Sequence, residues 1–463
     1  MDKLAIRRRN STLMRVALLI ITLAVAAVAT LSIISSLAGA VKVTDIAVSH
    51  GTSIVLTEGG EVWTWGYEWH GVLGRTLDIH DPITDQSTPK PVPYRSGNLT
   101  GVTDIAAGLA HVVALKDDGT VMTWGYNHYG QLGDGTTTDS MSASGTVSLS
   151  QVKGLDHVKA VAAGLLYSLA LKDDGTVWAW GYNRYGQLGS GEFTRFEKTP
   201  VQVEGLSGIA QIYAGYNHNV AIDGNGNAWA WGSNDLGELG DGTNVSQCTP
   251  IRIAALSGAK DVALGSSYTI ALYGDGTVKA WGENYGGWLG DGTTTQKISP
   301  VAVKGVDHVN EVATGEGISF ASRDDGTVMA WGMNRAGTIG NGVPDQRVYM
   351  PGKIGDMKGI MRFAVGPIHV LGIKEDGSLW GWGDNQFGEM GTGMFTDKTY
   401  TPMRISLDRP ADPSQTTGQP TSAPDNATDG ASAGGSSHYL QYGIIALMCL
   451  IIAAAALVWY SRR

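Results

Sequence analysis

The sequence predicts an all-β protein in which most of the 463 residues form a seven-bladed β-propeller. Two observations predict this fold: a Trp-Gly pair that recurs along the chain, and an Asp-Gly pair shortly before it in most copies. A unit of about 50 residues cannot bury its apolar faces alone, so such units must pack against one another. The Trp-Gly pairs are spaced 50 to 59 residues apart, at Trp65, Trp124, Trp180, Trp231, Trp281, Trp331 and Trp382.

The third repeat shows the elements in order. Apolar strand patterns are predicted at 158–163, 167–171, 177–180 and 200–203. Asp174-Gly175 separates the second from the third, and this pair predicts a hairpin whose two central residues both adopt positive φ. Each unit is therefore predicted to be an antiparallel meander. Gly164 follows the first strand, and glycine there indicates the close backbone approach of an innermost strand around a narrow channel.

Ring closure is predicted from the two ends of the repeat region. The strand pattern at 401–405 matches the fourth strand of the third repeat, but no further first strand follows it. An unpaired first strand is predicted instead at 43–48. We therefore expect the terminal strands to share one blade, which closes the ring and leaves no open edge.

The repeat also carries a longer motif, which returns nearly intact at 163–189. Its parts are Ala107-Gly108-Leu109-Ala110-His111, Asp118-Gly119-Thr120-Val121, Trp124-Gly125-Tyr126-Asn127 and Gly130-Gln131-Leu132-Gly133. This motif resembles the repeat of the regulator of chromosome condensation family, and seven copies cover residues 41–408. The resemblance implies a seven-bladed propeller. The founding member of that family is a nuclear exchange factor for a small GTPase, a role that the acidic charge and hydrophobic ends of this chain argue against.

Hydrophobic segments flank the repeats. Residues 16–40 carry no charge and follow five basic residues, so 1–40 is predicted to be either a cleaved signal peptide or an N-terminal membrane anchor. Within 439–463, an apolar run at 443–460 predicts a transmembrane helix with a short basic cytoplasmic tail. Residues 409–438 are rich in Pro, Ser, Thr and Gly, which predicts a flexible stalk. The positive-inside rule then places the propeller outside the cytoplasm, and we expect a bacterial cell-surface protein.

Composition restricts the partners. The chain has 33 Lys and Arg against 43 Asp and Glu, a formal net charge of −10. Phosphate binding needs a basic face, so this charge argues against nucleic acid as a partner. Cys248 is the only cysteine outside the run at 443–460, so no internal disulfide is expected in the propeller. We expect a monomer that is stabilised by the packing of its repeats.

A search for chemistry returns no catalytic motif. His111, His218 and His369 hold the same position in three repeats, which indicates a structural role. The Asp-Gly-Thr segments at Asp134, Asp241 and Asp291 lack the alternating ligands of a calcium loop and are interpreted as turns. The sequence therefore predicts no catalytic residue, bound metal or cofactor.

Two positions directly after Trp-Gly-x-Asn vary from repeat to repeat. Because each stands at the same point of its repeat, all seven loops are expected on one face of the ring. Aromatic and Arg residues on a rigid face are typical of a protein-binding hot spot, although the aromatics could instead pack only between neighbouring loops. The predicted ligand-binding face comprises Trp69, His70, His128, Tyr129, Arg184, Tyr185, Tyr285, Trp288, Arg335 and Phe387.

The sequence thus predicts a non-enzymatic, membrane-anchored binding module that engages an extracytoplasmic protein or glycan through one loop face. A first alternative is an enzyme that acts on cell-envelope or host polymers, with Asp235, Glu238 and Glu316 as candidate carboxylates. A second is a structural spacer or adhesin, whose loop face would tolerate mutation.

Overall fold

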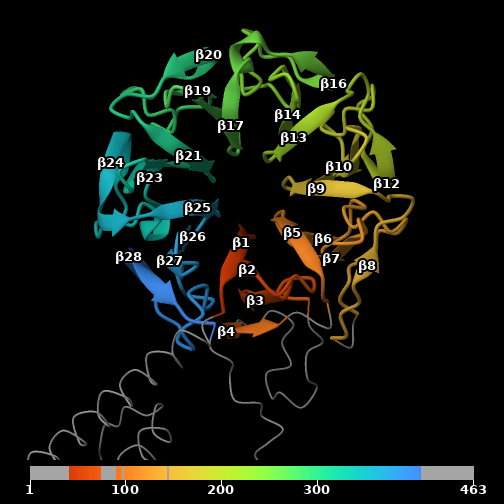
Figure 1. Cartoon of the computed structure of the whole chain (residues 1–463), viewed down its shortest axis with the longest axis horizontal. Helices are drawn as coiled ribbons and strands as arrows, with labels where there is room; N and C mark the ends of the chain where they lie inside the picture. The colour runs from red at the N-terminus through yellow and green to blue at the C-terminus, as the bar shows by residue number, and fades with distance from the viewer. Residues whose placement is uncertain (1–40, 75–89, 96–98, 143–144, 408–463) are drawn as a thin grey trace, which may run out of the picture. The chain divides into compact units, whose positions relative to one another are not determined.

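The computed structural model describes residues 41–74, 90–95, 99–142 and 145–407, which form seven four-stranded antiparallel sheets around a central axis (Figure 1). The predicted all-β, seven-bladed propeller is confirmed. The strands of each blade are consecutive in the chain, and the first lies innermost. Blades 1 to 4 comprise β1 (Val43–Val48), β2 (Thr52–Thr57), β3 (Val62–Gly66) and β4 (Lys90–Arg95); β5 (Val102–Ala107), β6 (His111–Lys116), β7 (Val121–Gly125) and β8 (Ser150–Gln151); β9 (Val158–Ala163), β10 (Tyr167–Lys172), β11 (Val177–Tyr182) and β12 (Phe196–Gln202); β13 (Ile209–Ala214), β14 (His218–Asp223), β15 (Ala228–Gly232) and β16 (Gln247–Arg252).

Blades 5 to 7 repeat this order. They comprise β17 (Ala259–Leu264), β18 (Tyr268–Tyr273), β19 (Val278–Gly282) and β20 (Lys297–Ala302); β21 (Val309–Thr314), β22 (Ile318–Arg323), β23 (Thr327–Met333) and β24 (Arg347–Lys358); β25 (Ile360–Val365), β26 (His369–Lys374), β27 (Leu379–Asp384) and β28 (Lys398–Ile405). Two short 3-10 turns, Ala254–Leu256 and Arg335–Gly337, lie between strands.

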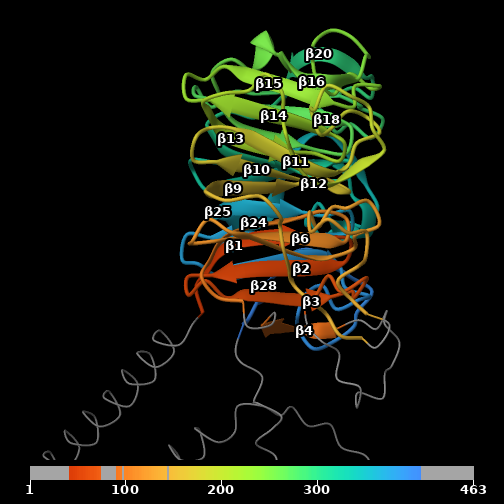
Figure 2. The same cartoon turned by 90° about the vertical axis from the view of Figure 1, so that its right-hand side faces the viewer.

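The second and third strands of each blade are apolar on both faces. In β10, for example, five of six residues are buried, whereas the outer strand β12 has no buried residue. Successive blades lie face against face when seen from the side (Figure 2), so the inner strands are covered on both sides. This double burial explains why the strands are nearly continuous apolar runs instead of alternating ones.

The Trp-Gly pair joins each blade to the preceding one. All seven indoles are fully buried, and each Nε1 donates a hydrogen bond of 2.7 to 3.0 Å to a loop carbonyl of the preceding blade. The following glycines have φ between 101° and 111°. A Cβ at Gly125, for example, would lie 2.2 Å from the Ala110 carbonyl oxygen. Glycine is therefore required where the third strand meets the turn between the first two strands.

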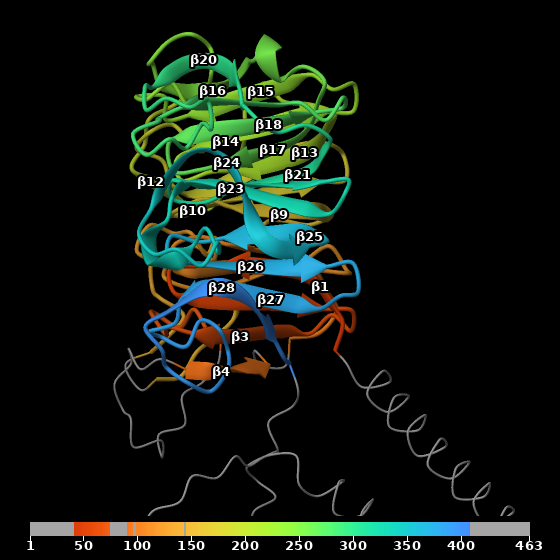
Figure 3. The same ribbon diagram turned by 90° about the vertical axis from the view of Figure 1, so that its left-hand side faces the viewer.

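The seam between blades 7 and 1 differs from the prediction. β28 pairs only with β27 and β1 only with β2, so the terminal strands do not share a blade, and that expectation is wrong. The strand that completes blade 1 is β4, which follows the segment 67–89 in the first repeat. Blades 7 and 1 instead pack face to face, with β25 and β26 beside β1 (Figure 3). The seam contains the same contact as every other interface, since Trp65 Nε1 donates to the Glu389 carbonyl at 2.7 Å.

The Asp-Gly hairpins form at the expected places with a different geometry. Only the glycine has positive φ, as at Gly119 (78°), so the prediction that both central residues adopt it is wrong. Lys116 and Gly119 close a turn by the hydrogen bonds Lys116 N–H to Thr120 O and Gly119 N–H to Lys116 O. The Asp118 carboxylate accepts the backbone N–H and the hydroxyl of Thr120, which stabilises the turn. These turns lie at the opposite ends of the strands from the Trp-Gly loops.

The predicted signal or anchor segment at 1–40, the stalk at 409–438 and the transmembrane helix at 439–463 lie outside the described residues. Within the described part of the chain, no helix has the length and apolar character needed to cross a membrane.

Candidate functional site

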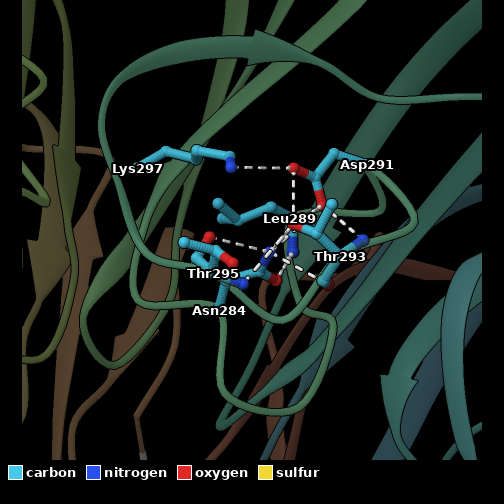
Figure 4. Close-up of polar contacts among 6 residues, drawn as sticks. All are labelled: Asn284, Leu289, Asp291, Thr293, Thr295 and Lys297. Atoms are coloured by element: carbon cyan, nitrogen blue, oxygen red, sulfur yellow. Dashed lines mark hydrogen bonds and ion pairs between the residues drawn. The ribbon is translucent and has the colours of Figure 1, made fainter.

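The loops that follow Trp-Gly are held by a buried asparagine. Asn284 Nδ2 donates to Asp291 Oδ1 (3.1 Å) and to the carbonyls of Thr293 (3.1 Å) and Thr295 (3.2 Å), as Figure 4 shows. Its Oδ1 accepts the N–H of Leu289 at 3.0 Å. Asparagines at the equivalent position accept an N–H from five residues further on in five other blades. The loop backbones are therefore fixed before any ligand binds.

The acidic Asp-Gly-Thr segments belong to the same framework. Oδ1 of Asp134 accepts the N–H and hydroxyl of Thr136, and Asp241 and Asp291 do the same for Thr243 and Thr293. Their interpretation as turns is confirmed.

The three histidines at equivalent positions are structural, as predicted. His111, His218 and His369 are fully buried, and each Nε2 lies 3.0 to 3.1 Å from the hydroxyl of Ser168, Thr269 or Ser53 in the next blade. Burial lowers the pKa of His111 to about 4 and those of His218 and His369 to about 3. These imidazoles are therefore neutral at pH 7 and link neighbouring blades.

The predicted binding residues differ in how far they reach the surface. The first variable position is exposed in His128, Arg184, Tyr285 and Arg335. The second is half-buried in Tyr129, Tyr185 and Phe387, and Trp69 and His70 are half-buried as well. A half-buried ring packs within the loops and also presents an edge to solvent. Both interpretations left open by the sequence, a binding surface and packing between neighbouring loops, therefore apply to these residues.

Trp288 does not belong to this face. It is 7% exposed, its ring centroid lies 5.6 Å from that of Tyr268, and its carbonyl accepts the Trp331 indole N–H. The indole fits below the loop because Gly286 and Gly317 leave room, and a Cβ at either glycine would come within 2.7 Å of it. The prediction that Trp288 joins the exposed set is wrong.

The loops of blades 1 to 3 bring five of the ten predicted residues together. Ring centroids lie 6.1 Å apart for Trp69 and Tyr126, 6.3 Å for Tyr126 and Tyr129, 5.0 Å for Tyr129 and Tyr182, and 6.3 Å for Tyr182 and Tyr185. The contacts are continuous across three blades. We call this set the aromatic band, and it comprises Trp69, His70, Tyr126, His128, Tyr129, Tyr182, Tyr185 and Phe196.

Besides Trp288, four predicted residues lie outside the band, and one of them, Arg184, is exposed on the loop of blade 3. Tyr285 contacts Arg347, whose guanidinium lies 4.9 Å from the ring centroid, and Phe387 packs against Tyr67 at 4.6 Å. Arg335 is exposed on the loop of blade 6. The predicted face is therefore divided, with its aromatic part concentrated on blades 1 to 3.

The band is tied together by a carboxylate at the junction of blades 1 and 2. His70 Nδ1 lies 2.6 Å from Asp139 Oδ2, and His128 Nε2 lies 3.6 Å from the same oxygen. The other oxygen of Asp139 accepts the N–H of Asn127, the asparagine that holds the loop of blade 2. His70 adopts φ 57°, an uncommon conformation outside glycine, so this contact fixes a strained loop.

Sequence analysis missed Tyr126 and Tyr182, which connect the predicted residues to one another. A signal was present, because the x of Trp-Gly-x-Asn is Tyr in repeats 2 and 3, and Tyr67 holds the same place in repeat 1. Repeats 4 to 7 carry Ser, Glu, Met and Asp there, at Ser233, Glu283, Met333 and Asp384. The position is half-buried beside the variable pair in blades 1 to 3. Tyr126 and Tyr182 extend the band there, whereas Tyr67 packs against Phe387.

The carboxylates considered for catalysis have structural partners. Glu238 is 2% exposed and accepts the Ser233 hydroxyl (2.7 Å) and the Leu236 N–H (2.9 Å). Burial raises the pKa of Glu238. Asp235 accepts a hydrogen bond from the Ser246 hydroxyl. Glu316 is exposed, and burial together with the Glu316 carboxylate raises the pKa of Tyr216. Glu238 and Asp235 are thus engaged in holding a loop.

Comparison with known proteins identifies the repeat. A family model of the RCC1-like domain matches residues 26–371, and one of the regulator of chromosome condensation (RCC1) repeat matches 363–389. The human E3 ubiquitin-protein ligase HERC2 is 36% identical over 208 residues, which are 44% of this chain and 4% of HERC2. The ultraviolet-B receptor UVR8 of Arabidopsis thaliana is 31% identical over 212 residues, which are 45% of this chain and 45% of UVR8. The match thus spans less than half the length of either relative.

Solved structures share the fold. Yeast RCC1 (Prp20), solved with Kap60 bound, has a TM-score of 0.65 at 22% identity over 80% of this chain and 88% of that chain. Human WBSCR16 has a TM-score of 0.63 at 24% identity over 75% of this chain and 94% of that chain. At these identities the likeness shows the fold alone. The chain therefore belongs to the RCC1-like domain family, whose propellers commonly serve as protein-interaction modules.

Proposed function

We propose that this chain is a non-enzymatic, monomeric binding propeller that engages a protein partner through the aromatic band. The observation that carries the proposal is the continuity of the band, in which rings from three blades are in contact on loops fixed by buried asparagines. Tyr and Trp held rigidly on a surface lose little entropy on binding and are enriched at the centres of protein interfaces.

A protein partner is favoured over a glycan. Most ring pairs of the band are tilted or edge-on, so few flat faces are free to stack on a sugar ring. Membership of a family of protein-interaction modules supports the same choice. The formal net charge of −10 disfavours nucleic acid. An exchange role like that of nuclear RCC1 has no support beyond the shared fold.

The proposal includes a location. The apolar run at 443–460 and the basic residues that follow it support a membrane anchor with the propeller on the extracytoplasmic side of a bacterial cell. Mass spectrometry of the mature N-terminus checks the other end of the chain. Val41 as the first residue indicates a cleaved signal peptide, and an intact Met1 or Asp2 indicates a second anchor.

The test is capture of partners from envelope extract by the full chain in detergent. Replacing Trp69, Tyr129 and Tyr185 by Ala removes three band residues, and each such anchor in a hot spot contributes about 2 kcal/mol or more, roughly a 30-fold change in Kd. The matched control is Tyr285→Ala, which removes an exposed ring of the same face outside the band.

We expect the parent and the control to retain one protein that the triple variant loses. Retention by the triple variant would contradict the assignment of the band. Capture of a glycan in place of a protein would contradict the choice of partner class.

A further inference from the structure

Five innermost strands carry a charged residue at the same position. It is the third residue of each strand, where the register with the second strand is the same: Asp45, Asp104, Asp261, Glu311 and Arg362. The other two innermost strands carry Ala160 and Gln211 at this position. The innermost strands lie around the central axis (Figure 1), and Arg362 interacts electrostatically with Asp45, Glu311 and Asp104.

Each charged group links two neighbouring blades. Asp104 accepts the N–H of Val161 at 3.1 Å, and Glu311 accepts the N–H of Phe363 at 3.2 Å. Burial and the Asp261 carboxylate of the next blade raise the pKa of Tyr213, on the innermost strand of blade 4.

The fourth link crosses the seam, because Arg362 of β25 pairs with Asp45 of β1. This ion pair joins the last blade to the first. Like the other interfaces between blades, the seam has no shared strand, and this ion pair adds a side-chain contact across it.

The net charge of these five side chains depends on which of the carboxylates are protonated. Desolvation by burial raises the pKa of Asp104 to about 7 and that of Glu311 to about 8. Asp45 raises the pKa of Asp104 further, and Asp261 raises that of Glu311 further. Arg362 opposes the rise at both sites. Desolvation also raises the pKa of Asp261. Arg362 is the one basic residue at this position in the seven innermost strands, and it opposes the rise in the pKa of Asp104, Asp261 and Glu311.

We propose that these groups form a proton-dependent clasp: Arg362 holds blade 7 to blade 1 while Asp104 and Glu311 are protonated, and the seam loosens when they ionise. Ionisation adds negative charges that repel one another and that one guanidinium cannot balance. The seam yields first because it contains Arg362, the group on which this charge balance depends. This device is independent of the binding function proposed for the loop face.

The experiment is hydrogen exchange of the full chain at pH 6 and pH 9, corrected for intrinsic exchange rates. We expect amides of β1 and β25 to open at least about tenfold more often at pH 9, since one proton released over one pH unit changes an equilibrium tenfold. Amides of β7 and β15, third strands that carry no titratable side chain, serve as the internal reference and change less.

Variants separate the clasp from general destabilisation. Glu311→Gln and Asp104→Asn flatten the pH dependence at the seam, Arg362→Met steepens it, and Arg362→Lys retains most of the parent behaviour. The matched control is Arg323→Met, which breaks an ion pair with Asp307 away from the channel and leaves the seam unchanged. Equal loosening of all blades, or a pH dependence that survives in the doubly substituted Asp104→Asn, Glu311→Gln protein, would overturn the proposal.

Discussion

Replacing Trp65 by Phe tests whether the seam is an ordinary blade interface. The indole is fully buried, and the substitution removes its hydrogen bond to the Glu389 carbonyl. That carbonyl still accepts the Ser53 hydroxyl at 3.0 Å, so it is not left unsatisfied, and the lost hydrogen bond costs about 1 kcal/mol. The smaller ring leaves a cavity that costs about 2 kcal/mol more. We expect the free energy of unfolding to fall by about 3 kcal/mol.

Trp180→Phe is the matched comparison. Its Nε1 donates to the Gln131 carbonyl at 2.9 Å, and that carbonyl also accepts the Ser168 hydroxyl at 3.1 Å. The two substitutions therefore remove the same contacts from two interfaces. Urea unfolding with an unchanged m-value measures both costs. A cost for Trp65→Phe that is lower than that for Trp180→Phe by more than about 1 kcal/mol would refute the equivalence of the seam with the other interfaces.

Three further predictions concern stability. Between pH 6.5 and pH 8 the free energy of unfolding, measured by urea titration, should fall by about 2 kcal/mol. Folding raises the pKa of Asp104 and Glu311, so the folded protein keeps protons that the unfolded chain has lost. A free energy of unfolding that does not change over this range would contradict the prediction. His218→Gln should lose less stability than the parent between pH 6.5 and pH 4.5. Burial lowers the pKa of His218 to about 3, so only the unfolded imidazole takes up a proton in that range. An equal loss of stability in the variant and the parent would contradict this prediction. Asn284→Ala should cost about 3 kcal/mol in thermal unfolding, since it leaves the Leu289 N–H and buried loop carbonyls without partners, and a cost below about 1 kcal/mol would show that the loop is held by other contacts.

The repeat unit could be predicted because its signals are local. Trp-Gly and Asp-Gly mark positions where glycine must adopt positive φ, and the structure places a glycine with positive φ at each of them. The closing blade could not be predicted in the same way. A period of about 50 residues leaves open where a blade starts, and the segment 67–89 between β3 and β4 is longer than the corresponding segments of blades 3 to 7.

The sequence predicted where the candidate site lies but only some of the residues that form it. Equivalent loop positions do lie on one face, because the strands that carry them are equivalent. Burial of an individual side chain depends on its neighbours from other blades, and no sequence pattern indicated that Gly317 leaves space for Trp288. The contribution of Tyr126 and Tyr182 was visible in the sequence as a difference between the first three repeats and the rest.

The most direct test of partner binding at the aromatic band is site-specific photo-crosslinking in the cell that makes the protein. A photoreactive residue at His128, whose side chain is 59% exposed within the band, is compared with one at His308, 66% exposed at the turn face. We expect one protein to be cross-linked from position 128 and none from position 308. Cross-linking from position 308 alone would place the binding surface on the opposite face and contradict the account.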